Sequence, residues 1–271
     1  VQVTGTDSSI SASQDVRIVQ KFEGQDLQVL KYGTSDAEKV TLSFHVKSST
    51  TGTYSATLRH TNTSGTAYVN SLTFSISSAN TWEQKVLVFN GNTAQDIRNT
   101  NTEGLRLEIY LAVGSNFTSG GGANANSWTT GNTNRASASN VNLMTSTDND
   151  FFLTGVQMEV GEYTSSTIPP FQHESYGDNL QRCMRYYQNS YKLGNNLTST
   201  TGVNAVIVTS WNDGNCPFPN MFPIPMRDAP TVTLRPRGST TTGQINSNGT
   251  DRSATATDVS EKGVSYLTVT S

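Results

Sequence analysis

Residues 151–188 read FFLTGVQMEVGEYTSSTIPPFQHESYGDNLQRCMRYYQ, and they pass from one kind of local pattern to another. The apolar residues of the first part, which indicate a β-strand, are Phe151, Leu153, Val156, Met158 and Val160. Pro169 and Pro170 follow, and two adjacent prolines exclude both a helix and a central strand. The stretch therefore predicts the end of one β domain and the start of a connection to another.

A short amphipathic helix is predicted over residues 178–188, with Asp178 as its N-cap. Its apolar stripe consists of Leu180, Cys183, Met184 and Tyr187. A helix this short needs a packing partner to be stable. That partner is either the chain's own β domain or the same stripe in other copies of the chain, and in the second case the stripe is an oligomer seam.

Upstream of this stretch, apolar and polar residues alternate with period two at hairpin spacing. Strands are predicted over residues 14–23, 40–46, 53–60, 68–76, 82–88 and 105–111. With 151–160 and a weak N-terminal strand they make about eight, which fits a two-sheet jelly roll. Residues 114–147 show no period, and a segment this long is typically functional or disordered.

Downstream, residues 203–211, 231–234 and 264–269 are predicted strands. Between the first two lies CPFPNMFPIPMRDAP (216–230), whose prolines favour an extended edge strand or turns. The predicted fold class is therefore all-β. A jelly-roll β-sandwich (1–172) is followed by a linker with a short helix (173–190) and a second, smaller β domain (191–271).

Composition and charge exclude two classes of partner. Charged residues make up 14% of the chain and its formal net charge is -3, so no basic field for nucleic acid is expected. No apolar run is long enough for membrane insertion. Cys183 and Cys216 are too few for a disulfide framework, and two buried thiols are favoured over a pair.

Catalytic and metal motifs are weak. The sequence has no nucleophile elbow and no zinc-ligand spacing, and His45 lies on the polar face of its strand, so no enzyme is expected. The acidic run 148–150, with Glu159 and Glu162, offers oxygens for a structural calcium ion. A turn before a strand is the favoured interpretation of that run, and no other cofactor is predicted.

Carbohydrate binding has the better chemical basis, because sugars bind to aromatic faces flanked by amide and hydroxyl groups. Trp128, with Asn124, Asn126 and Arg135, supplies that chemistry in the long segment, and Tyr110 on the outward face of its strand joins it. The alternative, which is favoured, is that Trp128 fixes the long segment to the sandwich.

The segments TGVQMEVGE (154–162) and PFQHESYGDNLQRCMRYYQ (170–188) resemble a module of tailed-phage structural proteins, particularly marine and cyanophage-like ones. The resemblance extends to VTLSFHVKSSTTGTYSATLRH, ISSANTWEQKVLVF and GLRLEIYLAVGSNFTSG, so it covers residues 15–188. MFPIPMRDAPTVT (221–233) is similar to a phage-fibre motif. One departure is His45, where such proteins often have an aromatic residue.

This resemblance implies a jelly roll similar to galactose-binding-like modules, followed by a distal β domain and without catalytic residues. It implies a virion protein on the tail or capsid exterior, in a homo-oligomer for which a trimer is favoured. The implied partners are other virion proteins and host-surface glycan. The alternatives are a capsid decoration or head-fibre protein bound to the major capsid protein, and a polysaccharide-degrading spike, which the lack of a β-helix repeat disfavours.

Overall fold

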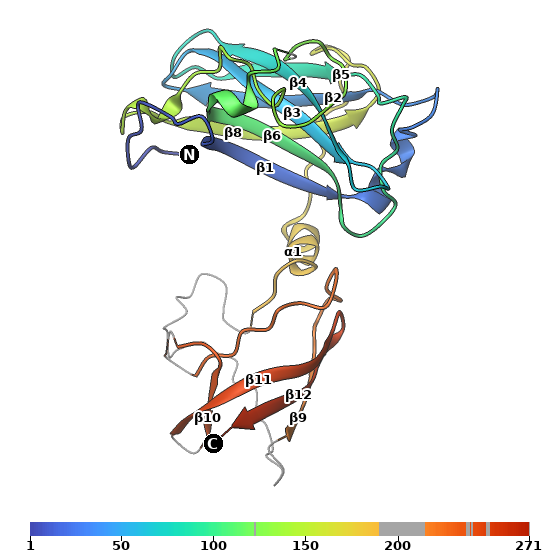
Figure 1. Cartoon of the computed structure of the whole chain (residues 1–271), viewed down its shortest axis with the longest axis vertical. Coiled ribbons are helices and arrows are strands. Elements are labelled where there is room, and N and C mark those ends of the chain that lie inside the picture. Colours follow the sequence, from blue (N-terminus) through green and yellow to red (C-terminus); the bar gives the residue numbers. More distant parts are fainter. Residues whose placement is uncertain (122, 190–214, 237–238, 240, 248–249, 271) are drawn as a thin grey trace. The chain divides into compact units, whose positions relative to one another are not determined.

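The computed structural model describes residues 1–121, 123–189, 215–236, 239, 241–247 and 250–270, with the backbone only for 215–220, 247 and 270. The chain divides into two compact units, Val1–Phe171 and Gln172–Ser271 (Figure 1). The short helix belongs to the second unit.

The first unit is built from eight strands and three short 3-10 helices. In chain order these elements are β1 (Asp15–Glu23), η1 (Gly24–Leu30), β2 (Val40–Ser48), β3 (Gly52–Thr61), β4 (Ala67–Ile76), β5 (Glu83–Phe89), β6 (Glu103–Val113), η2 (Ser115–Phe117), β7 (Thr129–Thr130), η3 (Leu143–Thr145) and β8 (Phe151–Val160). They form a five-stranded sheet, β1-β6-β3-β4-β7, and a three-stranded sheet, β5-β2-β8. All pairings within the two sheets are antiparallel.

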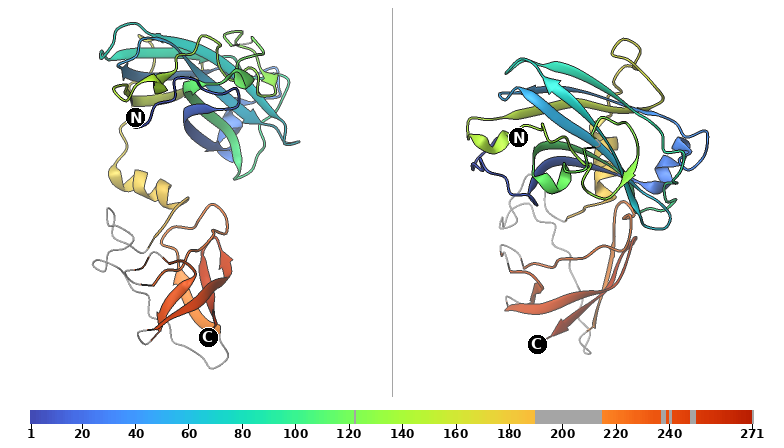
Figure 2. Two further views of the ribbon diagram at one scale, coloured as in Figure 1. Left: turned by 60° about the vertical axis from the view of Figure 1, so that its left-hand side comes forward. Right: turned by 45° about the horizontal axis from the view of Figure 1, so that its top comes forward.

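The two sheets pack face to face around one hydrophobic core (Figure 2). Alternation explains the packing: Val40, Leu42, Phe44 and Val46 of β2 are all buried, whereas His45 between them is exposed. The ring centroids of Phe44 and Phe74 lie 5.0 Å apart edge to face, which joins the sheets. The expected all-β sandwich is confirmed.

A bulge in β8 explains why its apolar residues change phase. The register shifts opposite the step from Ser43 to His45, and Gly155 there has a φ of 59°. Glycine adopts this conformation most readily, and the extra residue lets Leu153 before the bulge and Met158 after it both pack against the core. Phe151 is buried before the bulge, and Met158 packs against the core after it.

The segment without period, residues 114–147, is folded onto the first unit. It contributes η2, β7 and η3, and β7 adds an edge to the five-stranded sheet beside Tyr68 and Val69. The hydroxyls of Thr57 and Ser71 both donate to the carbonyl of Arg135. The segment therefore covers the part of that sheet's outer face around Thr57 and Ser71, and polar side chains there are buried beneath it.

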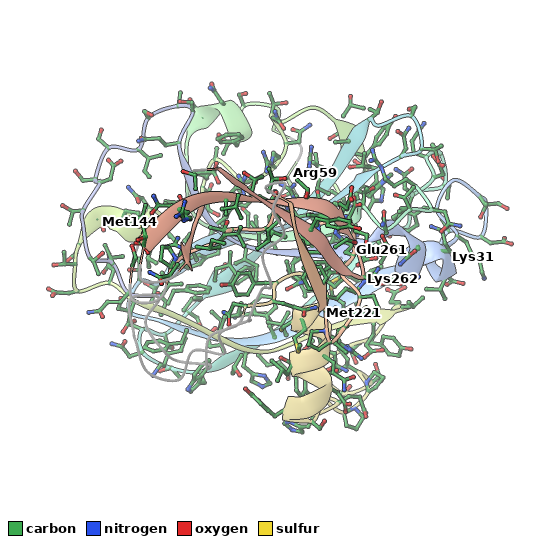
Figure 3. The ribbon with its side chains drawn as sticks, turned by 90° about the horizontal axis from the view of Figure 1, so that it is seen from below. Lys31, Arg59, Met144, Met221, Glu261 and Lys262 are labelled. Carbon is green, nitrogen blue, oxygen red and sulfur yellow. The ribbon has the colours of Figure 1, made fainter. Side chains whose placement is uncertain are left out.

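The described residues of the second unit form one helix and a four-stranded antiparallel sheet in the order β10-β11-β12-β9. Its elements are α1 (Tyr176–Met184), β9 (Asn215–Met221), β10 (Gln244–Ser247), β11 (Thr250–Ser260) and β12 (Gly263–Thr270). Its small core centres on Val264 and Leu267. Figure 3 labels Glu261 and Lys262 of the β11–β12 turn, whose carbonyls accept from the amides of Met226 and Phe222.

Several predictions for this unit need correction. The helix begins at Tyr176, and its N-cap is Ser175, whose hydroxyl accepts from the amide of Asp178, so Asp178 lies in the first turn instead. Residues 231–234 form no strand, whereas β10 and β11 were not predicted. The predicted strand 203–211 lies outside the described residues.

The proline-rich segment does supply an edge strand, as expected. β9 pairs with β12 alone among the described strands, and Pro217 and Pro219 fall within it. An edge position suits proline because the missing N–H leaves no ladder bond unmade on the open side. Cys183 is exposed and forms no disulfide, which corrects the expected burial of this thiol, and the side chain of Cys216 lies outside the described residues.

Candidate functional site

Trp128 is half-buried and fixes the long segment at the edge of the sandwich. Its indole Nε1 donates to the carbonyl of Asn90 over 2.8 Å. Its ring packs edge to face on His60 and Tyr32, with centroid distances of 4.7 and 5.5 Å. These contacts use the ring and the N–H that a sugar would need.

Asn126, the predicted amide neighbour, is also committed to the fold. Its Oδ1 accepts from Asn70 Nδ2 at 3.0 Å and from the amide of Asn90 at 2.9 Å. Its Nδ2 donates to the carbonyl of Val88 at 2.9 Å. Asn124 Oδ1 likewise accepts from the amide and hydroxyl of Thr73. The two amides therefore tie the long segment to β4 and β5.

Arg135 and Tyr110 are buried beneath the same segment around Glu108, which is fully buried. Arg135 donates to Glu108 through Nη2 and Nε at 2.6 and 3.2 Å, and the Tyr110 hydroxyl donates to it at 2.7 Å. Arg106 and Arg17 approach the carboxylate at 3.4 and 3.6 Å. These hydrogen bonds and ion pairs attach the long segment to β6.

The electrostatics of the network follow from burial and pairing. Burial alone would raise the pKa of Glu108, but the hydrogen bond and charge of Arg135, the Tyr110 hydroxyl and Arg17 hold it below its ordinary value. Burial, followed by the charge of Glu108, raises the pKa of Tyr110. Glu108 is thus a carboxylate and Tyr110 a neutral donor across the working pH range.

The four residues of the expected carbohydrate site make internal contacts, which agrees with the favoured alternative that Trp128 fixes the long segment to the sandwich. Tyr110 does face away from the core, but the long segment covers it, so no open surface remains there. Trp128 and Asn126 contact the edge between β4 and β5, whereas Arg135 and Tyr110 surround Glu108. The four residues belong to two separate sets of contacts, and both sets anchor the segment.

A buried histidine lies next to Trp128. Nδ2 of Asn92 is 2.8 Å from Nε2 of His60, which makes Nε2 the acceptor and places the proton on Nδ1. Tyr68 stacks on the ring at 5.3 Å. Burial lowers the pKa of His60 to about 4, against a smaller opposing effect of Asp96. His60 is therefore neutral in the folded protein at neutral pH.

An open aromatic surface lies on the other sheet, and we call it the Trp82 patch. Trp82, which directly precedes β5, and Phe152 of β8 are 47% and 41% exposed. Their centroids are 6.4 Å apart, and Nζ of Lys47, on β2 between them, lies 4.4 Å from the Phe152 centroid and 5.5 Å from that of Trp82. A cation against two aromatic faces holds all three side chains in place.

Polar side chains continue the Trp82 patch along the same face. His45 pairs in register with Gln84 of β5 and with Thr154 of β8, and all three are exposed. Residues directly opposite in antiparallel strands share a face, and His45 lies two residues before Lys47 on β2. These three side chains therefore lie next to Lys47 on the same face of the sheet. Aromatic rings thus stand beside an imidazole, an amide and a hydroxyl.

Hydrogen bonds to the side chain of Glu83 hold the turn that precedes β5 and contains Trp82. Glu83 Oε1 accepts from the amides of Ser77 and Ser78 at 2.8 and 2.9 Å. The hydrogen bond from Lys85, with those amides, lowers the pKa of Glu83 to about 2 against the opposing effect of burial. An ionised carboxylate therefore closes the turn and holds the backbone next to Trp82.

The far end of this sheet face is closed. Thr41 Oγ1 donates to the carbonyl of Gly161 and accepts from the amide of Tyr163. Gln157 Nε2 donates to the carbonyl of Pro169 at 3.0 Å. The chain after β8 covers that end, so the open part of the face is the Trp82 patch.

The remaining predicted sites have these positions. Leu180 and Met184 of α1 are half-buried, while Cys183 of α1 and Tyr187, which lies beyond its end, are exposed. The oligomer seam stays a prediction. In the described part of the chain, no three carboxylate, histidine or cysteine side chains gather as a metal site would require, including those of the 148–150 run. Nor does any described helix combine the length and apolarity needed to cross a membrane.

Comparison with known protein families, with curated proteins and with solved structures gives no match to this chain.

The Trp82 patch was not predicted from the sequence, although the pair Phe151-Phe152 indicated an exposed ring. In an alternating strand that begins Phe151-Phe152, one of the two rings must point outward. The sheet order β5-β2-β8 then places Phe152 near Trp82, seventy positions earlier in the chain.

Proposed function

We propose that this chain is a non-enzymatic glycan-binding protein and that the Trp82 patch contacts the sugar. The observation that carries the proposal is the exposed pair Trp82 and Phe152, fixed by Lys47 on a rigid sheet. Single exposed aromatics are common, but two that share a bridging cation and face solvent form a ready apolar platform.

The chemistry suits a hexose. The C–H face of a sugar ring buries apolar area on an indole or phenyl ring, as an aliphatic group does. Its hydroxyls then find donors and acceptors in Gln84, Thr154 and His45 alongside. A site of this kind is open and shallow, so we expect weak affinity for one sugar and tolerance of several.

We further propose, from the resemblance described above, that the chain is a subunit of a virion appendage of a tailed phage, such as a tail fibre. Weak sites suit that setting because an oligomer presents several copies to one cell surface. Effective concentration then raises the avidity by orders of magnitude without any new contact.

The glycan proposal is tested on a glycan array with the full chain and two variants. Trp82→Ala should lower the signal on every bound glycan by roughly fivefold or more, since truncating an aromatic anchor typically costs more than about 1 kcal/mol. The matched control is Val29→Ala, which removes exposed apolar surface on η1. Equal signals for wild type and Trp82→Ala would reject the patch.

The virion proposal is tested by electron microscopy of the encoding phage with gold-labelled antibody against the chain. Label on the tail is the expected result. Label on capsid faces would reject the tail fibre in favour of capsid decoration, and unlabelled virions would reject both.

A further inference from the structure

Three cations stand side by side across the outer face of the five-stranded sheet. Lys21 of β1 is directly opposite Arg106 of β6, and Arg106 is directly opposite Arg59 of β3. Side chains opposite one another share a face, and like charges in that position are destabilising. With strands about 4.8 Å apart, the row spans about 10 Å.

One carboxylate, that of Glu103, lies close to all three cations. Glu103 lies 3.3 Å from Lys21, 2.8 Å from Arg106 and 3.5 Å from Arg59. Arg106 is fully engaged, because its Nε and Nη2 both donate to Glu103 and its Nη1 donates to Glu108. The three cations of the row therefore outnumber the two carboxylates that pair with them, and one of these, Glu108, is shared with Arg17 and Arg135.

Arg59 is the least satisfied member. Its side chain is 24% exposed, and beyond the 3.5 Å ion pair with Glu103 its guanidinium makes no hydrogen bond within the described residues. Burial, followed by the positive charges of Arg106 and Arg135, lowers the pKa of Arg59. A guanidinium carries five donors in a planar fork, so Arg59, labelled in Figure 3, has donors that no described residue engages.

We propose that Arg59 and Lys21, backed by Arg106, bind the carboxylate groups of an acidic polysaccharide. A guanidinium binds a planar carboxylate through two parallel hydrogen bonds. The ammonium of Lys21, 61% exposed, supplies a second charge at the open end of the row. An incoming anion removes the repulsion between opposed cations, so binding stabilises the sheet as well.

A polysaccharide fits better than a nucleic acid. The chain's formal net charge is -3, and the row holds only three cations, whereas nucleic acid binding relies on many phosphate contacts over an extended basic surface. The site is independent of the Trp82 patch, because the row and the patch lie on the outer faces of different sheets. Either can fail without the other.

The test is titration calorimetry of the full chain with a galacturonic acid oligomer, its methyl ester, and single-stranded DNA of similar charge. The acid should bind, with an affinity that falls as salt rises, and the ester should bind at least tenfold more weakly. Arg59→Gln should lower the affinity for the acid by roughly tenfold or more. Lys31→Gln, which removes an exposed ammonium on another surface, should change it less than twofold.

Thermal unfolding of each variant checks its fold, and the acid should raise the melting temperature of wild type but not of Arg59→Gln. Should Arg59→Gln be unfolded, Lys21→Gln takes its place, since Lys21 is mostly exposed. Equal affinity for acid and ester, or unchanged affinity in a folded Arg59→Gln or Lys21→Gln variant, would overturn the inference. Tighter binding of the DNA would overturn the assignment to a polysaccharide.

Discussion

Glu108→Gln is expected to destabilise the first unit by about 3–5 kcal/mol, which is the usual result of removing one partner from a buried ion pair. The substitution keeps the shape of the side chain but removes its charge. Arg135 would then be buried without a counter-ion, beside Arg106 and Arg17. Urea unfolding followed by tryptophan fluorescence measures the loss, with an unchanged dependence on urea.

The matched variant is Arg135→Met, and its effect should be smaller. Glu108 would keep the Tyr110 hydrogen bond and the charges of Arg106 and Arg17. Combining both substitutions should cost less than the sum of the two, since the double variant leaves no unpaired charge at this contact. Additive losses, or a larger loss for Arg135→Met, would show that Glu108 does not hold the long segment in place.

Lowering the pH from 7 to 4 is expected to remove about 3 kcal/mol of stability through His60 alone. Burial lowers its pKa from 6.5 to about 4 in the folded state. Between those values the unfolded state binds a proton that the folded state does not, so stability falls as pH falls through this window. Below about pH 4 both states are protonated and this contribution becomes constant.

The pH dependence is measured by urea unfolding at half-unit steps, with His60→Phe and His45→Gln as variants. His60→Phe should flatten the profile between pH 6.5 and 4, whatever its stability at pH 7. His45→Gln, at an exposed position on the Trp82 patch, is the matched control and should retain the wild-type slope. An unaltered slope in His60→Phe would assign the pH dependence to other groups.

The strands of the sandwich could be predicted because each of them buries one face. Leu42, Phe44 and Val46 alternate with polar residues in the sequence, and the structure places them in the core. The bulge in β8 is also visible in the sequence, because the spacing of apolar residues changes from two to three between Leu153 and Val156. Local periodicity carries this information without any long-range contact.

The burial of Tyr110 could not be predicted in the same way. Alternation correctly places its side chain outside the core, but what covers it is the long segment, which has no period. The segment is held by individual hydrogen bonds to Arg135, Asn124 and Asn126 from distant strands. Such contacts depend on tertiary geometry that a run of Gly, Ser, Thr and Asn does not encode locally.

The candidate sugar-binding residues differ between the sequence prediction and the structure for the same reason. Trp128 has the right chemistry for a sugar, yet the structure uses its ring and N–H to close the sandwich edge. Trp82 and Phe152 read as ordinary strand residues, and only the sheet order brings them together around Lys47. The residue types indicated that aromatic rings could contact a sugar, and the order of the strands determines which of these rings are exposed.

The most direct test follows the tryptophan indole N–H signals by NMR while the full chain is titrated with a glycan that the array identifies. The signal of Trp82 should shift progressively and saturate, while that of Trp128, hydrogen-bonded to Asn90, should stay in place. A shift of the Trp128 signal with Trp82 unchanged would contradict the account and return the sugar site to the long segment.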